Sequence, residues 1–364
     1  MTNQVLVFTA VLFLVIPGIS SLKSTFAQTT AASEDNQVSD RHYGRARINV
    51  ERGIKITLGN RTTGRITVNG WDRDVIEAHA LSERGDEVVI ARFTDDSAGK
   101  KLFLKADYAD LNKPVAPTTP LMSPPENSKG LKGLLKVHFE VNVPRYVEID
   151  LIRVWYSDVQ ITGVQTAISV WGDQSSVILK RVGAVAARTR GGSVEVEDAE
   201  GLVSVNTTGG GVRVYRVQGN VSVVSISGPI EIKCVQGRVE VANTEASIDL
   251  ADIDGEVKAA ATNSSVRFTG GLRDDGRYDL KSMSGRVEMI LPDNTKGFDA
   301  SLSSYQGIIE SDFKLKTTQP IIEGHHGRRM IGRFGNGKSQ ILLDSFDGLV
   351  RLSKVPPSKI EGCK

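Results

Sequence analysis

An apolar pair recurs along the middle of the chain at intervals close to nine residues. In each repeat, a β-branched or other apolar residue is followed two positions later by a second one. The first members of these pairs are Val159, Ile168, Val177, Val185, Val194, Val203, Val212, Val221, Ile230, Val239, Ile248, Val257, Val266, Tyr278 and Val287. Alternation of apolar and polar residues over a short span is typical of a strand with one buried face. Residues 159–289 therefore predict a series of short strands in a regular repeat.

The links between these strands alternate in chemistry, so the repeating unit has about 18 residues. One kind of link has a glycine two positions before the next strand, at Gly201, Gly219, Gly237 and Gly255. The other kind has a small residue five positions before the next strand, at Thr189, Thr207, Ser225, Asn243, Ala261 and Ser282. If each unit is one coil of two strands, equivalent residues of successive coils stack about 4.8 Å apart.

This spacing predicts an all-β chain that forms a right-handed parallel β-solenoid, with about 18 residues and two strands per coil. An antiparallel meander is the alternative. A meander would require hairpin turn residues at every link between strands. It would also not explain why links of the same chemistry recur at every second position.

The sequence on either side of the repeat predicts β-rich caps, which a solenoid needs to cover its open edges. We expect a single β-solenoid domain over residues 45–355, followed by a tail at 356–364. Its predicted parts are the N-terminal cap strands at 45–111, a proline-rich loop at 112–133, the repeat coils at 134–292, and the C-terminal coils and cap at 293–355.

The N-terminus predicts export. Residues 5–16 are apolar apart from Thr9 and are too few to span a bilayer; a polar stretch follows, with a plausible cleavage site after Ala27. We expect a signal peptide over residues 1–27 and a disordered leader over residues 28–44, with an uncleaved N-terminal anchor as the alternative. The mature protein would then be secreted, periplasmic or at the cell surface, with no transmembrane segment.

The charge balance and the cysteine count each exclude a class of protein. The 45 basic and 43 acidic residues nearly cancel, which argues against nucleic acid as a partner. The two cysteines, Cys234 and Cys363, are too few for a disulfide-stapled scaffold. Whether they pair is left open by the sequence, and we interpret both as incidental.

Catalysis on a β-helix would require clustered carboxylates on adjacent coils of one face. The repeat spacing stacks two outward columns, one of Glu195, Arg213, Glu231, Asp249 and Arg267, and one of Asp198, Arg216, Cys234 and Asp252. Only Glu231 and Asp249 are adjacent acids within these columns, and arginines flank them on both sides. Alternating charges on neighbouring strands attract each other, so a salt-bridged face is favoured over a catalytic site.

Other candidate sites have simpler structural interpretations. The glycine clusters at 209–211 and 332–338 lack the helix that a phosphate loop requires. The acidic pairs at 252–254 and 274–275 are interpreted as turns and not as calcium loops. His325 and His326 are too few for a metal site, and a solvated loop is favoured.

Two further groups of residues could contact a ligand. His138 falls on the polar phase of its strand, so we expect it to face solvent. Trp71, Trp155 and Trp171, with Tyr156, could form a sugar-stacking surface, although burial of the tryptophans in the caps is favoured. The sequence thus predicts no catalytic, cofactor-binding or metal-binding residue.

Several segments resemble the putative adhesin family of exported bacterial β-solenoid proteins. These are residues 64–72, 141–149, 335–341 and 348–352, together with the Gly-x-Val-x-Val repeats, and the resemblance extends over about residues 45–355. It implies a right-handed β-helical fold and an adhesin-like role in the cell envelope, and it offers no catalytic residue to transfer. The prolines between residues 112 and 133 depart from the family pattern.

We therefore expect a non-enzymatic cell-envelope interaction or structural module whose partner is a glycan, the cell wall or another protein. A carbohydrate-active enzyme on a β-helix, either a polysaccharide lyase or a hydrolase, is the main alternative. A partner in envelope-stress signalling is a third. The identity of the ligand and the oligomeric state are left open.

Overall fold

The computed structural model describes residues 40–60, 63–82, 88–95, 101–108, 136–317, 322–324, 327–359 and 362–363. The predicted signal peptide, the proline-rich loop at 112–133, and His325 and His326 lie outside these residues. No helix within the described part of the chain is long and apolar enough to cross a membrane.

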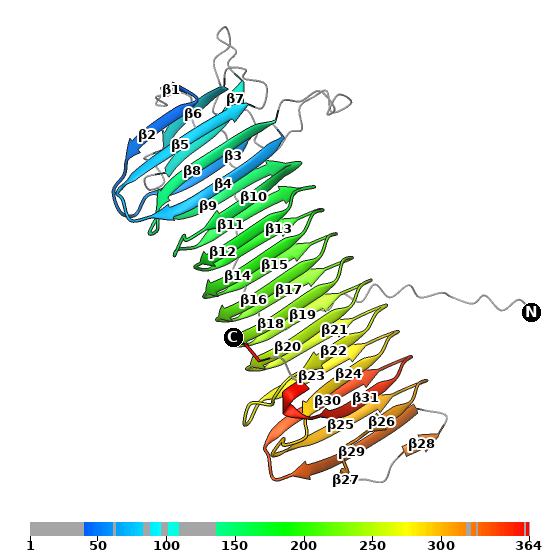
Figure 1. Cartoon of the computed structure of the whole chain (residues 1–364). Helices are drawn as coiled ribbons and strands as arrows, with labels where there is room; N and C mark the ends of the chain where they lie inside the picture. The colour runs from blue at the N-terminus through cyan, green and yellow to red at the C-terminus, as the bar shows by residue number, and fades with distance from the viewer. Residues whose placement is uncertain are drawn as a thin grey trace, which may run out of the picture. The chain divides into compact units, whose positions relative to one another are not determined.

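Successive strands of the repeat alternate between two sheets that face each other (Figure 1). In the first sheet, here sheet A, the repeat strands are β9 (Glu148–Trp155), β11 (Ile168–Asp173), β13 (Val185–Thr189), β15 (Val203–Thr207), β17 (Val221–Ser225), β19 (Val239–Asn243), β21 (Val257–Ala261) and β23 (Arg277–Ser282). In the second, sheet B, they are β10 (Ser157–Thr162), β12 (Val177–Val182), β14 (Val194–Glu200), β16 (Val212–Gln218), β18 (Ile230–Gln236), β20 (Ile248–Asp254), β22 (Val266–Thr269) and β24 (Val287–Pro292).

Neighbouring strands within each sheet are parallel, and each pairs with its equivalent one coil away. Val203 of β15 is opposite Val221 of β17, and Val212 of β16 is opposite Ile230 of β18. In each pair the two partners are separated by one full repeat of the sequence. The predicted all-β parallel solenoid with two strands per coil is therefore confirmed.

The core lies between the two sheets. The first and third residues of most repeat strands point inward and are almost fully buried, as at Val203, Val205, Val212 and Val214. A single coil cannot bury this apolar face alone, so each coil is stable only when stacked on its neighbours. The apolar pair in each repeat is thus the sequence signal of the core.

The predicted polar corner is buried and hydrogen-bonded. Thr189 Oγ1 donates to Thr207 Oγ1 at 2.9 Å, and Thr207 Oγ1 donates to the Gly209 carbonyl oxygen at 2.6 Å. Two coils further along, Asn243 Nδ2 donates to the Gly228 carbonyl oxygen at 2.9 Å. The stacked hydroxyls and amide satisfy backbone carbonyls that the bend would otherwise leave unpaired.

Both ends of the solenoid are closed by strands that are out of sequence order. At the N-terminal end, β3 (Lys55–Asn60) and β4 (Gly64–Trp71) pair with β9 and β10, while β7 (Lys101–Tyr108) and β8 (Val137–Pro144) lie outside them. At the C-terminal end, β30 (Ser339–Ser345) lies between β23 and β25 (Gly297–Ser304), and β31 (Val350–Val355) lies between β24 and β26 (Ile309–Ser311). At the C-terminal end the chain first forms the outer coil, which is β25 and β26, and the later strands β30 and β31 then form a coil nearer the middle of the solenoid. At the N-terminal end the inner coil, which is β3 and β4, comes before the outer coil, which is β7 and β8.

Antiparallel strands cover the outer edges. They are β1 (Asp40–Tyr43), β2 (Arg45–Asn49), β5 (Val75–Ser82) and β6 (Val88–Asp95) at one end, and β27 (Lys316–Thr317), β28 (Ile322–Gly324) and β29 (Gly327–Gly335) at the other. The predicted end of the disordered leader at residue 44 is wrong, because β1 forms a strand that pairs with β6. Beyond β31, the chain forms the short 3-10 helix η3 (Pro357–Lys359).

Candidate functional site

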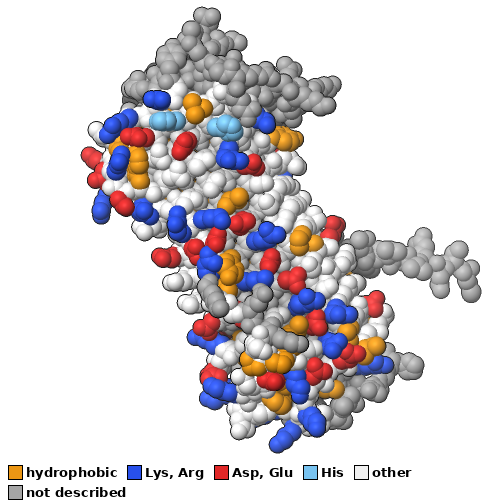
Figure 2. Space-filling model, viewed as in Figure 1, with side chains coloured by type: hydrophobic (Ala, Val, Ile, Leu, Met, Phe, Trp, Pro, Cys, Tyr) orange, Lys and Arg blue, Asp and Glu red, His pale blue; other side chains and the backbone are white. Residues whose placement is uncertain are grey.

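Charged side chains of both signs form a column on the outer face of sheet B. The column, here the charge ladder, consists of Glu195, Arg213, Glu231, Asp249, Arg267, Glu288, Arg351 and Glu310, each on the strand next to that of its neighbour. The stacking of its first five members follows the sequence prediction. Figure 2 shows basic and acidic side chains interleaved over the face in view.

The adjacent acids Glu231 and Asp249 are engaged in ion pairs. Lys233 Nζ lies 2.6 Å and Arg213 Nε 3.5 Å from the Glu231 carboxylate oxygens, and Arg267 Nη1 lies 4.0 Å from Asp249 Oδ1. The hydrogen bond from Lys233 lowers the pKa of the Glu231 carboxyl. A glycosidase needs one carboxyl of raised pKa to protonate its leaving group. The shift at Glu231 has the opposite sign, as expected for the salt-bridged face.

A shallow groove of about 830 Å³ lies over the middle of the ladder. It extends across the strands from β14 to β22, and its charged lining includes Arg213, Glu231, Lys233 and Arg267. Because ammonium, guanidinium and carboxylate groups share its floor, the groove offers hydrogen-bond donors and acceptors side by side. Its chemistry therefore suits a polar partner that carries both kinds of group.

The second outward column marks a backbone bend in sheet B. Asp198, Arg216, Cys234 and Asp252 have φ values of 56°, 52°, 61° and 50°, a region that residues other than glycine seldom adopt. In β14 the bend falls between the inward residues Val196 and Ala199. We name these four residues the bend column. The bend can be recognised in the sequence, because two polar residues in succession, such as Glu197 and Asp198, interrupt the alternation of apolar and polar positions.

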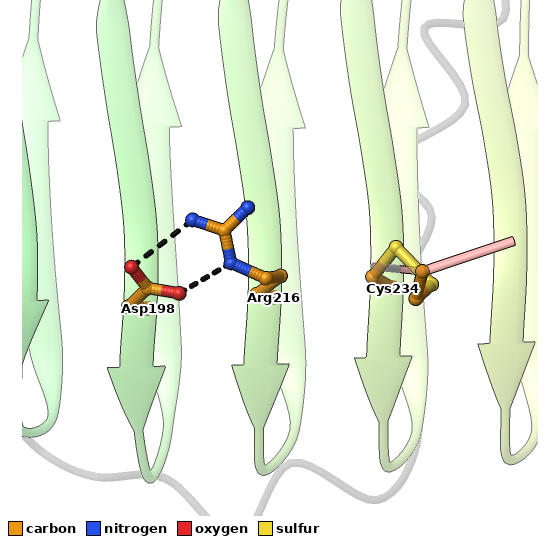
Figure 3. Close-up of a disulfide and its surroundings, with 4 residues drawn as sticks. Asp198, Arg216 and Cys234 are labelled. Carbon is orange, nitrogen blue, oxygen red and sulfur yellow. Dashed lines mark hydrogen bonds and ion pairs between the residues drawn. A yellow bond between two sulfur atoms is a disulfide. The ribbon is translucent and has the colours of Figure 1, made fainter.

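The bend column begins with a strong ion pair (Figure 3). Arg216 donates from Nε to Asp198 Oδ1 at 2.5 Å and from Nη2 to Asp198 Oδ2 at 3.0 Å, and it also donates to Glu197. Two-point pairing of this kind is the strongest form of an arginine–carboxylate contact. The hydrogen bonds from Arg216 lower the pKa of the Asp198 carboxyl.

We expect the contribution of this ion pair to stability to disappear in acid. Because the folded-state pKa of Asp198 lies below its ordinary value of 3.8, the pair stabilises the fold above that value, and the effect is lost as pH falls through the folded pKa. Urea unfolding at neutral pH should therefore show Arg216→Met to be less stable than the wild type, and the difference should shrink as the pH falls below about 3.8. Arg286→Met, at an exposed arginine, is the control. A difference that stays constant with pH would contradict the assignment.

Further along the bend column, Cys234 forms a disulfide with Cys363 (Figure 3). The two cysteines are 129 residues apart, and their Cα atoms are separated by 5.5 Å. The interpretation of both cysteines as incidental is therefore wrong. The bond ties the predicted C-terminal tail at 356–364 back to β18 in the middle of the solenoid. Its place at the bend explains how Cys234 can reach the tail, since side chains of this column project outward.

Asp252 is the next member of the bend column and lies beside the disulfide. One carboxylate oxygen of Asp252 and the sulfur atoms of Cys234 and Cys363 all lie within 4.8 Å of one another. Burial raises the pKa of the Asp252 carboxyl, and the positive charge of Lys233 opposes this shift. The sequence placed Cys234 and Asp252 in one column, but it gave no position for Cys363.

The tryptophans are partly buried and covered by arginines. Arg153 lies over the Trp171 ring at 5.5 Å from its centroid, and Arg188 approaches the same ring at 6.0 Å. Arg190 lies 5.6 Å from the Trp155 ring centroid. The guanidinium groups thus occupy ring faces on which a sugar would stack. Tyr156 is 50% exposed and lies at a bend with φ of 47°.

The remaining candidates have structural roles. His138 is exposed on β8, as predicted. In the two glycine clusters, close backbone contact requires the absence of a side chain. A Cβ atom on Gly210 would lie 2.0 Å from the Gly192 carbonyl oxygen, and one on Gly337 would lie 1.8 Å from the Gly297 carbonyl oxygen. Asp275 has φ of 61° and belongs to the predicted turn.

Comparison with known proteins gives one family match. The family described as Toastrack DUF4097 matches residues 147–353, which is more than half of the chain. No curated protein matches the sequence.

Three solved structures are similar to the chain. A putative adhesin from Bacteroides fragilis is 10% identical over 88% of this chain and 98% of its own, with a TM-score of 0.29. A putative cell adhesion protein from Clostridium sporogenes is 8% identical over 86% of this chain and 100% of its own, with a TM-score of 0.19. A putative lipid binding protein from Parabacteroides distasonis is 11% identical over 88% of this chain and 98% of its own, with a TM-score of 0.21.

Proposed function

Since the chain belongs to the Toastrack DUF4097 family, we propose that it is an exported, non-enzymatic β-solenoid that serves the cell envelope as an interaction or structural module. The domain at 45–355 would be its working unit, and the segment at 1–27 would direct its export. Its partner would be a glycan, the cell wall or another protein, bound along the outer face of sheet B.

The charge ladder is the observation that supports this function. Its three arginines pair with acids on neighbouring strands, and Lys180 and Lys233 beside the column pair with Glu195 and Glu231. Together the five acids of the ladder and these five bases nearly balance, so this face has little free energy to gain from a simple polyanion or polycation. A partner that presents hydroxyl groups, or charges of both signs, can exchange hydrogen bonds with the ladder over the whole length of the groove. We therefore expect binding that depends only weakly on salt concentration.

A binding screen of the mature protein against a glycan array and against envelope fractions tests this proposal. The expected result is retention by at least one glycan or envelope fraction, competed by that same material in soluble form. Exchange of Lys233 and Arg267 in the groove for glutamate should weaken retention, whereas the same exchange of Arg188 on sheet A should not. Absence of retention by every fraction would overturn the proposed function.

The enzyme alternative is tested at Glu231 and Asp249. We expect the Glu231→Ala/Asp249→Ala protein to release the same background of products as the wild type from a panel of acidic and neutral polysaccharides, because both carboxyls are engaged in ion pairs. Its stability should change by no more than about 1 kcal/mol, since the pairs are at the surface. Glu240→Ala on sheet A is the matched control. Cleavage by the wild type that the double variant loses would establish the enzyme instead.

A further inference from the structure

We propose that Cys234, Cys363 and Asp252 form a metal site that alternates with the disulfide: when the two cysteines are reduced, their sulfurs and the Asp252 carboxylate bind one thiophilic divalent cation of the zinc class. The proposal concerns the C-terminal tail and does not require the proposed function, although Asp252 also lines the groove on sheet B. It rests on three ligand atoms that the fold brings together from β18, β20 and the tail.

The geometry of the three atoms suits a tetrahedral cation. In a site with zinc–sulfur distances near 2.3 Å and zinc–oxygen distances near 2.1 Å, the ligand atoms lie roughly 3.5–3.8 Å apart. The carboxylate oxygen and the two sulfurs already lie within 4.8 Å of one another. The sulfurs must separate once their bond is broken, and the tail can provide this movement. Cys363 is exposed near the end of the chain, and Gly362 beside it has open space around it.

The chemistry of the ligands selects the class of metal. Two thiolates are soft ligands and favour zinc-like cations over calcium or magnesium, which prefer oxygen ligands. Three protein ligands would leave the fourth position of a tetrahedral cation open to water. Asp252 is suited to be the third ligand because its neighbour in the bend column is Cys234, whereas Asp198 is already held by Arg216.

The two states exclude each other, since the metal requires thiolates and the disulfide has none. A dithiol reductant would start the exchange through attack of one thiolate on the exposed Cys363 sulfur, which displaces Cys234 as a thiolate. The second thiol of the reductant then releases Cys363 and leaves the reductant as a disulfide, so two electrons pass to the protein sulfurs. Metal binding then displaces the thiol protons. The tail would stay anchored to β18 in either state.

Titration of the full-length protein with cobalt(II) after reduction tests the site, because cobalt–thiolate bonds give an intense charge-transfer absorption. We expect one-to-one binding with this absorption in the reduced protein and none in the oxidised protein. Cys363→Ser should remove the absorption. Loss of an outer-shell partner alone costs roughly 10- to 100-fold in metal affinity, so Asp252→Asn should weaken binding at least about tenfold. Asparagine tolerates the left-handed conformation of this position, and Asp254→Asn is the matched control.

Alkylation of the reduced wild-type protein tests for the metal site without any substitution. Zinc should protect both cysteines from iodoacetamide, with the extent of labelling measured by mass spectrometry. Equal labelling with and without zinc would overturn the proposal. So would equal cobalt binding by the reduced wild type and by Cys363→Ser, or by Asp252→Asn and Asp254→Asn.

Discussion

Breaking the Cys234–Cys363 disulfide should lower the free energy of unfolding by about 3–5 kcal/mol. The bond closes a loop of 129 residues, for which the loss of chain entropy in the unfolded state gives roughly 5 kcal/mol at 25 °C. The closed loop extends from β18 through the C-terminal coils to the tail, so it includes the strands that return to form β30 and β31. We therefore expect the C-terminal half of the solenoid to lose most of the stability.

The measurement is urea unfolding of Cys363→Ser, Cys234→Ser and the double variant under oxidising conditions, followed by circular dichroism. All three proteins should be destabilised by the same amount, because each lacks the same bond and the effects of two partners in one bond do not add. Ser358→Ala in the same tail is the control and should behave as the wild type. Single variants that differ from the wild type by less than about 1 kcal/mol would show that the closed loop does not limit unfolding.

The repeat part of the fold could be predicted because its sequence period equals its structural period. Once coils of two strands are inferred from that period, the neighbour of Glu231 across the sheet must be Arg213 on one side and Asp249 on the other, and the structure has this register. Side-chain columns on a solenoid are therefore available from sequence alone, including the one that argues against catalysis.

The ends of the solenoid were not predictable in the same way. Placement of β30 between β23 and β25 depends on which strand edge is open after the outer coil has formed, and no local pattern encodes that choice. The tail has no repeat, so Cys363 has no register, and its pairing with Cys234 follows only from the three-dimensional path of the chain. The candidate metal site could not be predicted for the same reason, since one of its three ligands is on the tail.

A methyl group added at the glycine corner should strongly destabilise the stacking of the repeat coils. Gly219 has φ of 149°, and a Cβ atom there would lie 2.2 Å from the carbonyl oxygen of Gly201 in the preceding coil. The unfavourable backbone conformation costs about 1–3 kcal/mol, and the forced separation of two coils costs about the same again. We expect Gly219→Ala to lower the free energy of unfolding by about 3 kcal/mol or more.

The glycine column extends this prediction to the neighbouring coils. A Cβ atom on Gly237 would lie 2.3 Å from the Gly219 carbonyl oxygen, so Gly237→Ala should cost a similar amount in the same urea unfolding experiment. Gly271→Ala is the matched control, because a Cβ atom at Gly271 meets nothing within 4 Å. Gly219→Val should cost at least as much as Gly219→Ala, because a β-branched residue is tolerated even less at positive φ. Destabilisation of Gly219→Ala no greater than that of Gly271→Ala would mean that the coils can separate without loss, and that the glycines at this corner are not required for stacking.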